Sequence, residues 1–173
     1  MRDRERLMLT SDLAAAPEVG RWLAAMEDGR RDTLRELEGV TDAMVDARPP
    51  GSENSIGTTL YHVALIEADW LVDDIDGEAL ETSDLAPLFP FDDRDEAGVL
   101  TALEGVPLAD HLDRLAAVRS ALLVRMGPMP VEDFHAPRVR ARYDVSPSWV
   151  IHHLLQHESE HRAEIGWLRR RAG

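Results

Sequence analysis

Four segments of the chain place apolar residues at spacings of three and four, and no segment shows convincing strand alternation. These segments cover approximately residues 17–38, 56–75, 107–126 and 147–170. Pro17 and Pro147 suit a first helical position, and Ser55 and Ser146 can cap the helices that follow them. The pattern predicts an all-α protein built from four amphipathic helices.

The connections between these segments constrain how the helices are arranged. Residues 78–106 form a long link, whereas the other two connections are shorter. A long link lets the second and third helices run in the same direction. We therefore expect a four-helix bundle in up-down-down-up order, with a crossover between helices two and three. The 173 residues, 44% of them hydrophobic, suffice for one domain over 1–173, with its core at about 17–170.

The charge balance restricts the partners and the location of the protein. A net charge of −14 argues against nucleic acid, because phosphate contacts require clustered basic residues. No apolar run approaches the roughly 18 residues of a membrane span. Residues 1–6 mix both charge signs and no long apolar stretch follows them, which argues against a secretory signal. We expect a soluble, cytoplasmic protein that acts on a small molecule.

Acidic residues gather in one part of the chain. From Glu67 to Glu104 there are thirteen acids and one base, Arg94, which gives 1 − 13 = −12. The favoured interpretation is a solvated connection, and cation binding or partner docking is the alternative.

The chain contains no cysteine. Disulfides, thiolate metal ligands and a cysteine nucleophile are therefore excluded. A metal ion would need histidine, carboxylate or backbone oxygen ligands, and any thiol chemistry would use a thiol from solution.

The last helical segment carries two histidines one turn apart. His157 and His161 lie on one helix face, with about 5–6 Å between their Cβ atoms. They occupy core positions of an apolar stripe that includes Val150, Leu154 and Ile165. Two buried neutral imidazoles are costly unless a partner satisfies them, and a shared metal ion would do so. The alternative is a pair of core histidines bonded to carboxylates or water.

A metal site needs at least one further ligand, and His62 in the second segment is the candidate. Three imidazoles that leave coordination positions open are typical of a catalytic metal site. His153 extends the ladder by one turn and is either a fourth ligand or a neighbour of the site. His111 and His135 are expected at the surface, and His152 points away.

Residues 157–161 also match the H-E-x-x-H pattern of zinc peptidases. The extended form of that pattern fails, because Glu164 and Trp167 stand where Gly and His are required. A peptidase is therefore disfavoured.

A di-iron bundle would require two E-x-x-H motifs and two further glutamates. Glu158 and His161 form one such motif, but the second, Glu132 and His135, falls between helical segments. A single divalent ion, Zn, Ni or Fe, is favoured.

Two stretches carry a family resemblance. Residues 55–70, SIGTTLYHVALIEADW, and residues 148–163, SWVIHHLLQHESEHRA, resemble the second and fourth helices of the DinB-like superfamily. This superfamily includes mycothiol-dependent maleylpyruvate isomerases and bacillithiol transferases. The resemblance implies an up-down-down-up bundle, often a homodimer, with metal ligands at His62, His157 and His161.

The resemblance also suggests a function. The leading hypothesis is a metal-dependent thiol S-transferase that uses a low-molecular-weight thiol such as mycothiol on a small electrophile. The first alternative is a metal-dependent hydrolase, in which the ion activates bound water and Glu158 or Glu67 takes a proton as the catalytic base. The second alternative is a non-catalytic, stress-linked metal-binding protein.

Overall fold

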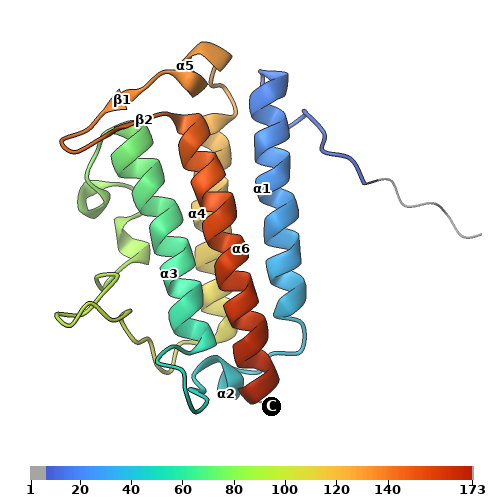
Figure 1. The fold of residues 1–173 in the computed structure, drawn as a ribbon, viewed down its shortest axis with the longest axis vertical. Helices are drawn as coiled ribbons and strands as arrows, with labels where there is room; N and C mark the ends of the chain where they lie inside the picture. The colour runs from blue at the N-terminus through green and yellow to red at the C-terminus, as the bar shows by residue number, and fades with distance from the viewer. Residues whose placement is uncertain (1–6, 173) are drawn as a thin grey trace, which may run out of the picture.

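The computed structural model describes residues 7–172, and four long helices lie side by side in it (Figure 1). They are α1 (Pro17–Glu36), α3 (Ile56–Asp69), α4 (Leu108–Met126) and α6 (Pro147–Ala172). In the view of Figure 1, α1 and α6 run downward, whereas α3 and α4 run upward. The packed helices agree with the predicted all-α class. Residues 1–6, on which the expected lack of a secretory signal partly depends, lie outside the described residues.

Apolar side chains from all four helices form the core. Helix α6 packs against α1 and α3, and α3 packs against α4. Fully buried residues include Leu23 of α1, Leu60 of α3, Leu122 of α4 and Ile165 of α6. The arrangement makes α3 and α6 direct neighbours, and this contact brings the histidines of the two helices together.

Two predicted helix starts are confirmed by hydrogen bonds. The Ser55 hydroxyl accepts a bond from the Thr58 N–H at 3.1 Å. The Ser146 hydroxyl accepts one from the Trp149 N–H at 3.2 Å, and Pro147 opens α6 as expected. These caps satisfy N–H groups that the helix itself leaves unpaired.

The second predicted helix does not run as one regular α-helix. Helix α3 ends at Asp69, and a π-helical turn, η1 (Trp70–Asp76), continues it to Gly77, whose φ of 78° suits glycine. Trp70 is only partly buried, whereas its neighbour Leu71 is fully buried.

Short elements fill the connections. They are α2 (Asp42–Val45), the 3₁₀ turns η2 (Leu80–Thr82) and η3 (Ala86–Leu88), α5 (Val131–His135), and strands β1 (Arg138–Val139) and β2 (Asp144–Val145). The strands pair antiparallel, with Arg138 opposite Val145. The sequence does not predict this hairpin, because two residues are too few to show alternation. His135 was expected between helical segments, whereas it ends α5.

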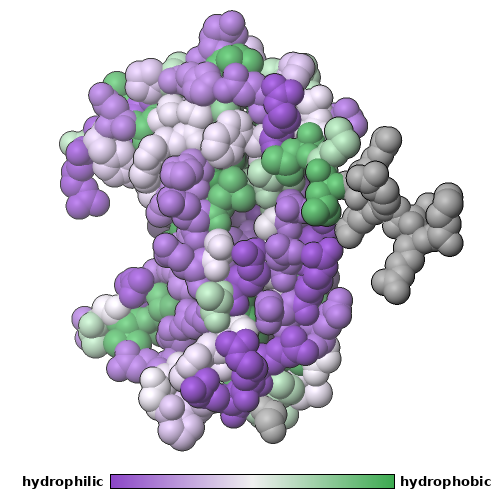
Figure 2. All heavy atoms as spheres, turned by 45° about the vertical axis from the view of Figure 1, so that its right-hand side comes forward, coloured by the Kyte–Doolittle hydropathy of each residue, from purple (hydrophilic) through white to green (hydrophobic). Residues whose placement is uncertain are grey.

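Hydrophilic side chains dominate the face shown in Figure 2, and the surface is notched at mid-height on the left of that view. Within residues 7–172, no helix combines the length and the apolar character needed to cross a membrane.

Candidate metal centre

Three imidazoles converge between α3 and α6. His62, His157 and His161 each offer a ring nitrogen, and these three atoms lie within 4.8 Å of one another. The Nε2 atoms of His62 and His157 are 3.0 Å apart. The rings of His157 and His161 approach edge to face, with their centroids 4.5 Å apart. We call these residues the histidine cluster, and they are the three ligands that the sequence predicts.

Carboxylates hold two of these rings from behind. The Nδ1 atom of His62 lies 2.5 Å from Oδ1 of Asp93, and Nδ1 of His161 lies 2.9 Å from Oε2 of Glu164. A carboxylate accepts a hydrogen bond from Nδ1–H, which fixes the tautomer and leaves the Nε2 lone pair free. Both rings can therefore offer Nε2 to a cation.

A buried tyrosine positions Asp93. The Tyr61 hydroxyl donates a 2.6 Å hydrogen bond to the Phe91 carbonyl and accepts a 3.1 Å bond from the Phe91 N–H. The Phe89 ring packs against the Tyr61 ring with centroids 5.7 Å apart. Because Tyr61 precedes His62 on α3, it fixes the acidic connection beside the ring that Asp93 contacts.

The surroundings of His157 keep its ring uncharged. Burial, together with the neighbouring imidazoles of His161 and His62, lowers the pKa of His157 to about 3. This ring is therefore neutral at physiological pH, as a metal ligand must be. The hydrogen bond from His161 holds the pKa of Glu164 below its usual value, so this carboxylate stays charged.

The donor set fits a divalent transition metal. In a four-coordinate zinc site, Zn–N bonds of about 2.0–2.1 Å place neighbouring nitrogens roughly 3.3 Å apart. The Nε2 atoms of His62 and His157, at 3.0 Å, are close to this spacing. Imidazole suits Zn, Ni and Fe, and the described part of the chain supplies no fourth residue to this group.

His153 lies beside the cluster without joining its donor group. Its ring stacks on Trp149 with centroids 5.1 Å apart and an angle of 10°, and it also contacts Trp70 at 4.9 Å. His152 is exposed, as expected. His135 is exposed too, but it has partners that the sequence does not predict, including Glu18 at 2.8 Å.

The prediction that His111 lies at the surface is wrong. Its exposed fraction is 1%, because it occupies the α4 stripe that continues through Leu115 and Val118. Gly57 makes room for it, since a Cβ atom there would lie 3.1 Å from the His111 Nε2 atom. Burial, with a smaller effect of Arg114, lowers the pKa of His111 to about 4.

Glu67 and Glu158 lie in a second buried group, which we call the ion-pair cluster. Its four members are Arg30, Glu67, Arg119 and Glu158. Arg30 contacts Glu67 at 2.8 Å and Glu158 at 2.7 Å, and Arg119 contacts them at 2.7 and 3.0 Å. Burial alone would raise the pKa of Glu67, but the two guanidiniums outweigh it and hold this pKa low. Neither carboxylate therefore has the surroundings of the catalytic base that the hydrolase hypothesis requires.

The carboxylates that hold the histidines were not among the residues predicted from the sequence. Glu164 lies three residues after His161 on the same helix, and this spacing was a usable signal. Asp93 carries no such signal, because it is one of many acids in a long connection.

The fold and the site together define a class of protein: a helical bundle with a three-histidine candidate metal centre between two of its helices. Residues 25–165 match the family model of the DinB superfamily, and the chain belongs to this superfamily. A search among curated proteins gave no match.

Proposed function

We propose that the histidine cluster holds one divalent metal ion and that the protein transfers a small thiol to an electrophile. The observation that carries the metal assignment is the convergence of His62, His157 and His161, with carboxylates at the Nδ1 atoms of two rings. The resemblance to thiol-dependent relatives supports the thiol. The lack of cysteine is consistent with a thiol that arrives from solution.

The ion would supply Lewis acidity that stabilises a small thiol as its thiolate at neutral pH. The chain's own residues bind the ion and orient its histidine ligands. Hydrogen bonds to Asp93 and Glu164 keep the protons of His62 and His161 on Nδ1, so that the Nε2 lone pair of each ring is free to coordinate. Burial keeps His157 neutral. This ring donates its Nε2–H to Nε2 of His62, so its proton must move to Nδ1 before Nε2 can coordinate a metal ion.

The positions of Glu67 and Glu158 weigh against the hydrolase alternative. A base must have a free lone pair within reach of the reacting proton. Both carboxylates instead accept bonds from Arg30 and Arg119. The non-catalytic alternative would keep the metal and lack turnover.

Metal content tests the first half of the proposal. Untagged protein, purified without chelator, is expected to contain one Zn, Ni or Fe per chain by elemental analysis. His157→Ala and His161→Ala should abolish stoichiometric binding, and His62→Ala should weaken it strongly, while helical content survives. His152→Ala is the matched control, because this histidine is exposed on the same helix. Retention of one ion per chain by all three cluster variants would refute the site.

Cobalt substitution tests whether a small thiol binds to the metal ion. Titration with mycothiol or a simpler thiol should produce a sulfur-to-cobalt charge-transfer band, and His157→Ala should eliminate it. The chain has no cysteine, so the band can come only from the added thiol. A cobalt protein that shows no band with any small thiol, yet cleaves an ester, would favour the hydrolase. Metal binding without turnover in either assay would favour the non-catalytic protein.

A further inference from the structure

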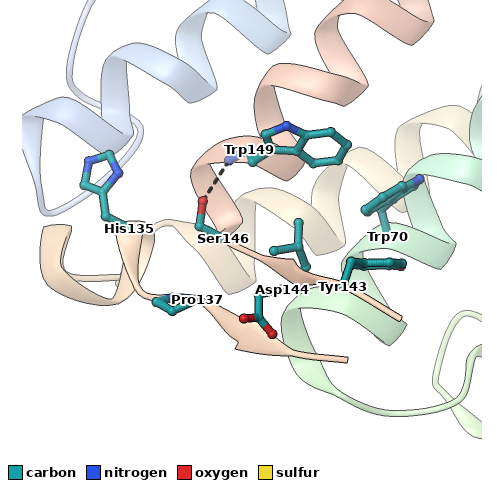
Figure 3. Close-up of a pocket in the computed structure, with 8 residues that line it drawn as sticks. Trp70, His135, Pro137, Tyr143, Asp144, Ser146 and Trp149 are labelled. Carbon is teal, nitrogen blue, oxygen red and sulfur yellow. Dashed lines mark hydrogen bonds between the residues drawn. The ribbon is translucent and has the colours of Figure 1, made fainter. Parts of the chain in front are cut away.

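A cavity of about 430 Å³ lies where α6 begins, apart from the histidine cluster (Figure 3). Trp70 from η1, Tyr143 from the hairpin and Trp149 from α6 contribute to its walls. The volume lies in the range of small-molecule sites. Nothing in the chemistry proposed above uses this cavity.

The aromatic walls are unusually exposed. Trp149 is 47% exposed and Tyr143 is 42% exposed, although the chain has only nine aromatic residues, 3 Phe + 4 Trp + 2 Tyr. Three of the nine therefore gather at one cavity. Exposed aromatic surface of this kind is typical of a binding site, because a ligand would remove it from water.

The spacing of the rings restricts what can bind. The Trp70 and Trp149 centroids are 5.3 Å apart and tilted by 46°, and those of Trp70 and Tyr143 are 6.2 Å apart. A flat ring inserted between two others needs roughly 7 Å, twice the optimal carbon contact distance. A ligand must therefore contact the rings from the cavity rather than slide between them.

Carboxylates surround this end of the bundle. Asp144 lines the cavity itself. Asp74 accepts a 3.0 Å hydrogen bond from the Tyr143 hydroxyl. Burial and the hydrogen bond to Asp74, followed by the charges of Asp74, Asp73 and Asp69, raise the pKa of Tyr143. Burial and neighbouring acids, among them Asp73 and Asp74, also raise the pKa of Asp69 to about 6.

Two basic side chains at this end are already engaged. Arg140 donates to the Asp74 carbonyl at 2.5 Å, and its Nε lies 3.7 Å from the Asp74 carboxylate. His135, on the cavity wall, contacts Glu18 at 2.8 Å. Both basic groups therefore contact acids other than Asp144, which lines the cavity.

We propose that this cavity binds an organic cation, such as a methylated ammonium group, against the faces of Trp70, Tyr143 and Trp149. Aromatic faces attract a cation through their quadrupoles, and carboxylates nearby add to the attraction. A neutral aromatic ligand could use the rings but would gain nothing from the acids, so charge complementarity selects the cation.

The cavity also relates to the histidine cluster. Trp149 and His157 are eight residues apart on α6, which places them about 12 Å apart along the axis at 1.5 Å per residue. His153 lies between them and stacks on Trp149. If the proposed function holds, a substrate that occupies both sites carries its cationic group about 12 Å from its reacting atom. Binding of the cation does not depend on that condition.

Choline and its neutral isostere 3,3-dimethylbutan-1-ol test the proposal. Each is titrated into the full-length protein, with and without chelator, by calorimetry and tryptophan fluorescence. Choline is expected to bind at least about tenfold more tightly than the neutral compound in both preparations. Trp149→Ala should weaken choline at least tenfold, and Trp149→Phe should retain most of the affinity. Asp144→Asn should weaken the binding of choline without changing the affinity for the neutral isostere.

Trp167→Ala is the matched control, because this α6 ring is already covered by the Arg171 guanidinium at 4.2 Å. It should bind choline like the unmodified protein. Equal affinity for the two isosteres, no choline binding by folded protein, or tighter binding of neutral indole would overturn the proposal. Since the chelated protein contains no metal, these outcomes are independent of whether the thiol chemistry holds.

Discussion

Two polar clusters share α3 and α6 and differ in how their polar groups are satisfied. The ion-pair cluster takes one residue from each long helix, and its two guanidiniums face two buried carboxylates. The histidine cluster comes from two helices only, and His157 and His161 are partly exposed. Its carboxylates lie behind two of the rings, and the Nε2 atoms of His62 and His157 face each other. The charged groups of the ion-pair cluster bond one another, whereas the histidine cluster has ring nitrogens that could still bind a cation.

The difference teaches which buried charges signal function. A charge-balanced network whose members bond one another needs no ligand and specifies how the helices pack. Converging imidazoles, two of which are held at Nδ1 by carboxylates, are organised for a cation. Glu158 and His157 are adjacent in sequence, yet they belong to different clusters because successive helical residues point in different directions.

The largest expected effect is on the ion-pair cluster. Arg119→Met would leave Glu67 and Glu158 with Arg30 as their remaining guanidinium partner. We expect the free energy of unfolding to fall by about 3–5 kcal/mol, because a buried charge loses its partner. Urea denaturation of metal-free protein measures this change.

Arg125→Met on the same helix is the control, since its partners Asp76 and Asp84 are more exposed. It should cost under about 1 kcal/mol. Equal losses in the two variants would contradict a special role for the buried cluster.

The second prediction concerns His111, a buried histidine outside both clusters. Its pKa is about 4 in the folded chain and near 6.5 in the unfolded chain, so the unfolded chain takes up the proton first. Its contribution to stability is complete above pH 6.5 and is lost as the pH falls toward 4. The loss is at most about 3 kcal/mol.

His111→Gln should flatten this part of the stability profile, measured by denaturation at several pH values. His152→Gln, at an exposed position, should leave the profile unchanged. An unaltered slope in His111→Gln would show that this group does not titrate as a buried histidine.

The third prediction concerns the carboxylates behind the rings. Asp93→Asn and Glu164→Gln should each weaken metal binding by about 10- to 100-fold, because they no longer hold the Nδ1–H with a charge. Competition with a chelator of known affinity measures this effect. Glu160→Gln, exposed on α6, is the control. Unchanged metal affinity in both variants would mean that the two carboxylates do not help to orient the rings for metal binding.

The smallest effect is expected at His153. Its ring contacts Trp70 and Trp149 instead of joining the donor group, so His153→Ala should change metal affinity by less than about twofold. The same competition assay applies. A loss as large as that of His157→Ala would make His153 a fourth ligand.

The sequence predicted what depends on local periodicity. Helix starts at Ser55 and Pro147 follow from capping chemistry, and the pairing of His157 with His161 follows from their spacing on an apolar stripe. His62 could be added because the contact between two helices was expected from the bundle.

Features that depend on assembly could not be predicted. Arg30 and Arg119 meet two glutamates only because four helices pack together, and no local pattern in the sequence marks this contact. His111 required knowledge that Gly57 lies opposite it. Asp93 reaches His62 through a long connection, in which no periodic signal distinguishes one acid from its neighbours.

The bond between Tyr61 and Phe91 bears on the rate at which a bound ion could leave. Because this bond holds the segment that carries Asp93, local opening of the segment would release the His62 ring from its carboxylate. Exchange would then follow the opening frequency of an exposed connection while the helices stay folded. Tyr61→Phe, which keeps the ring and removes the hydroxyl, should accelerate metal release even where equilibrium affinity changes little.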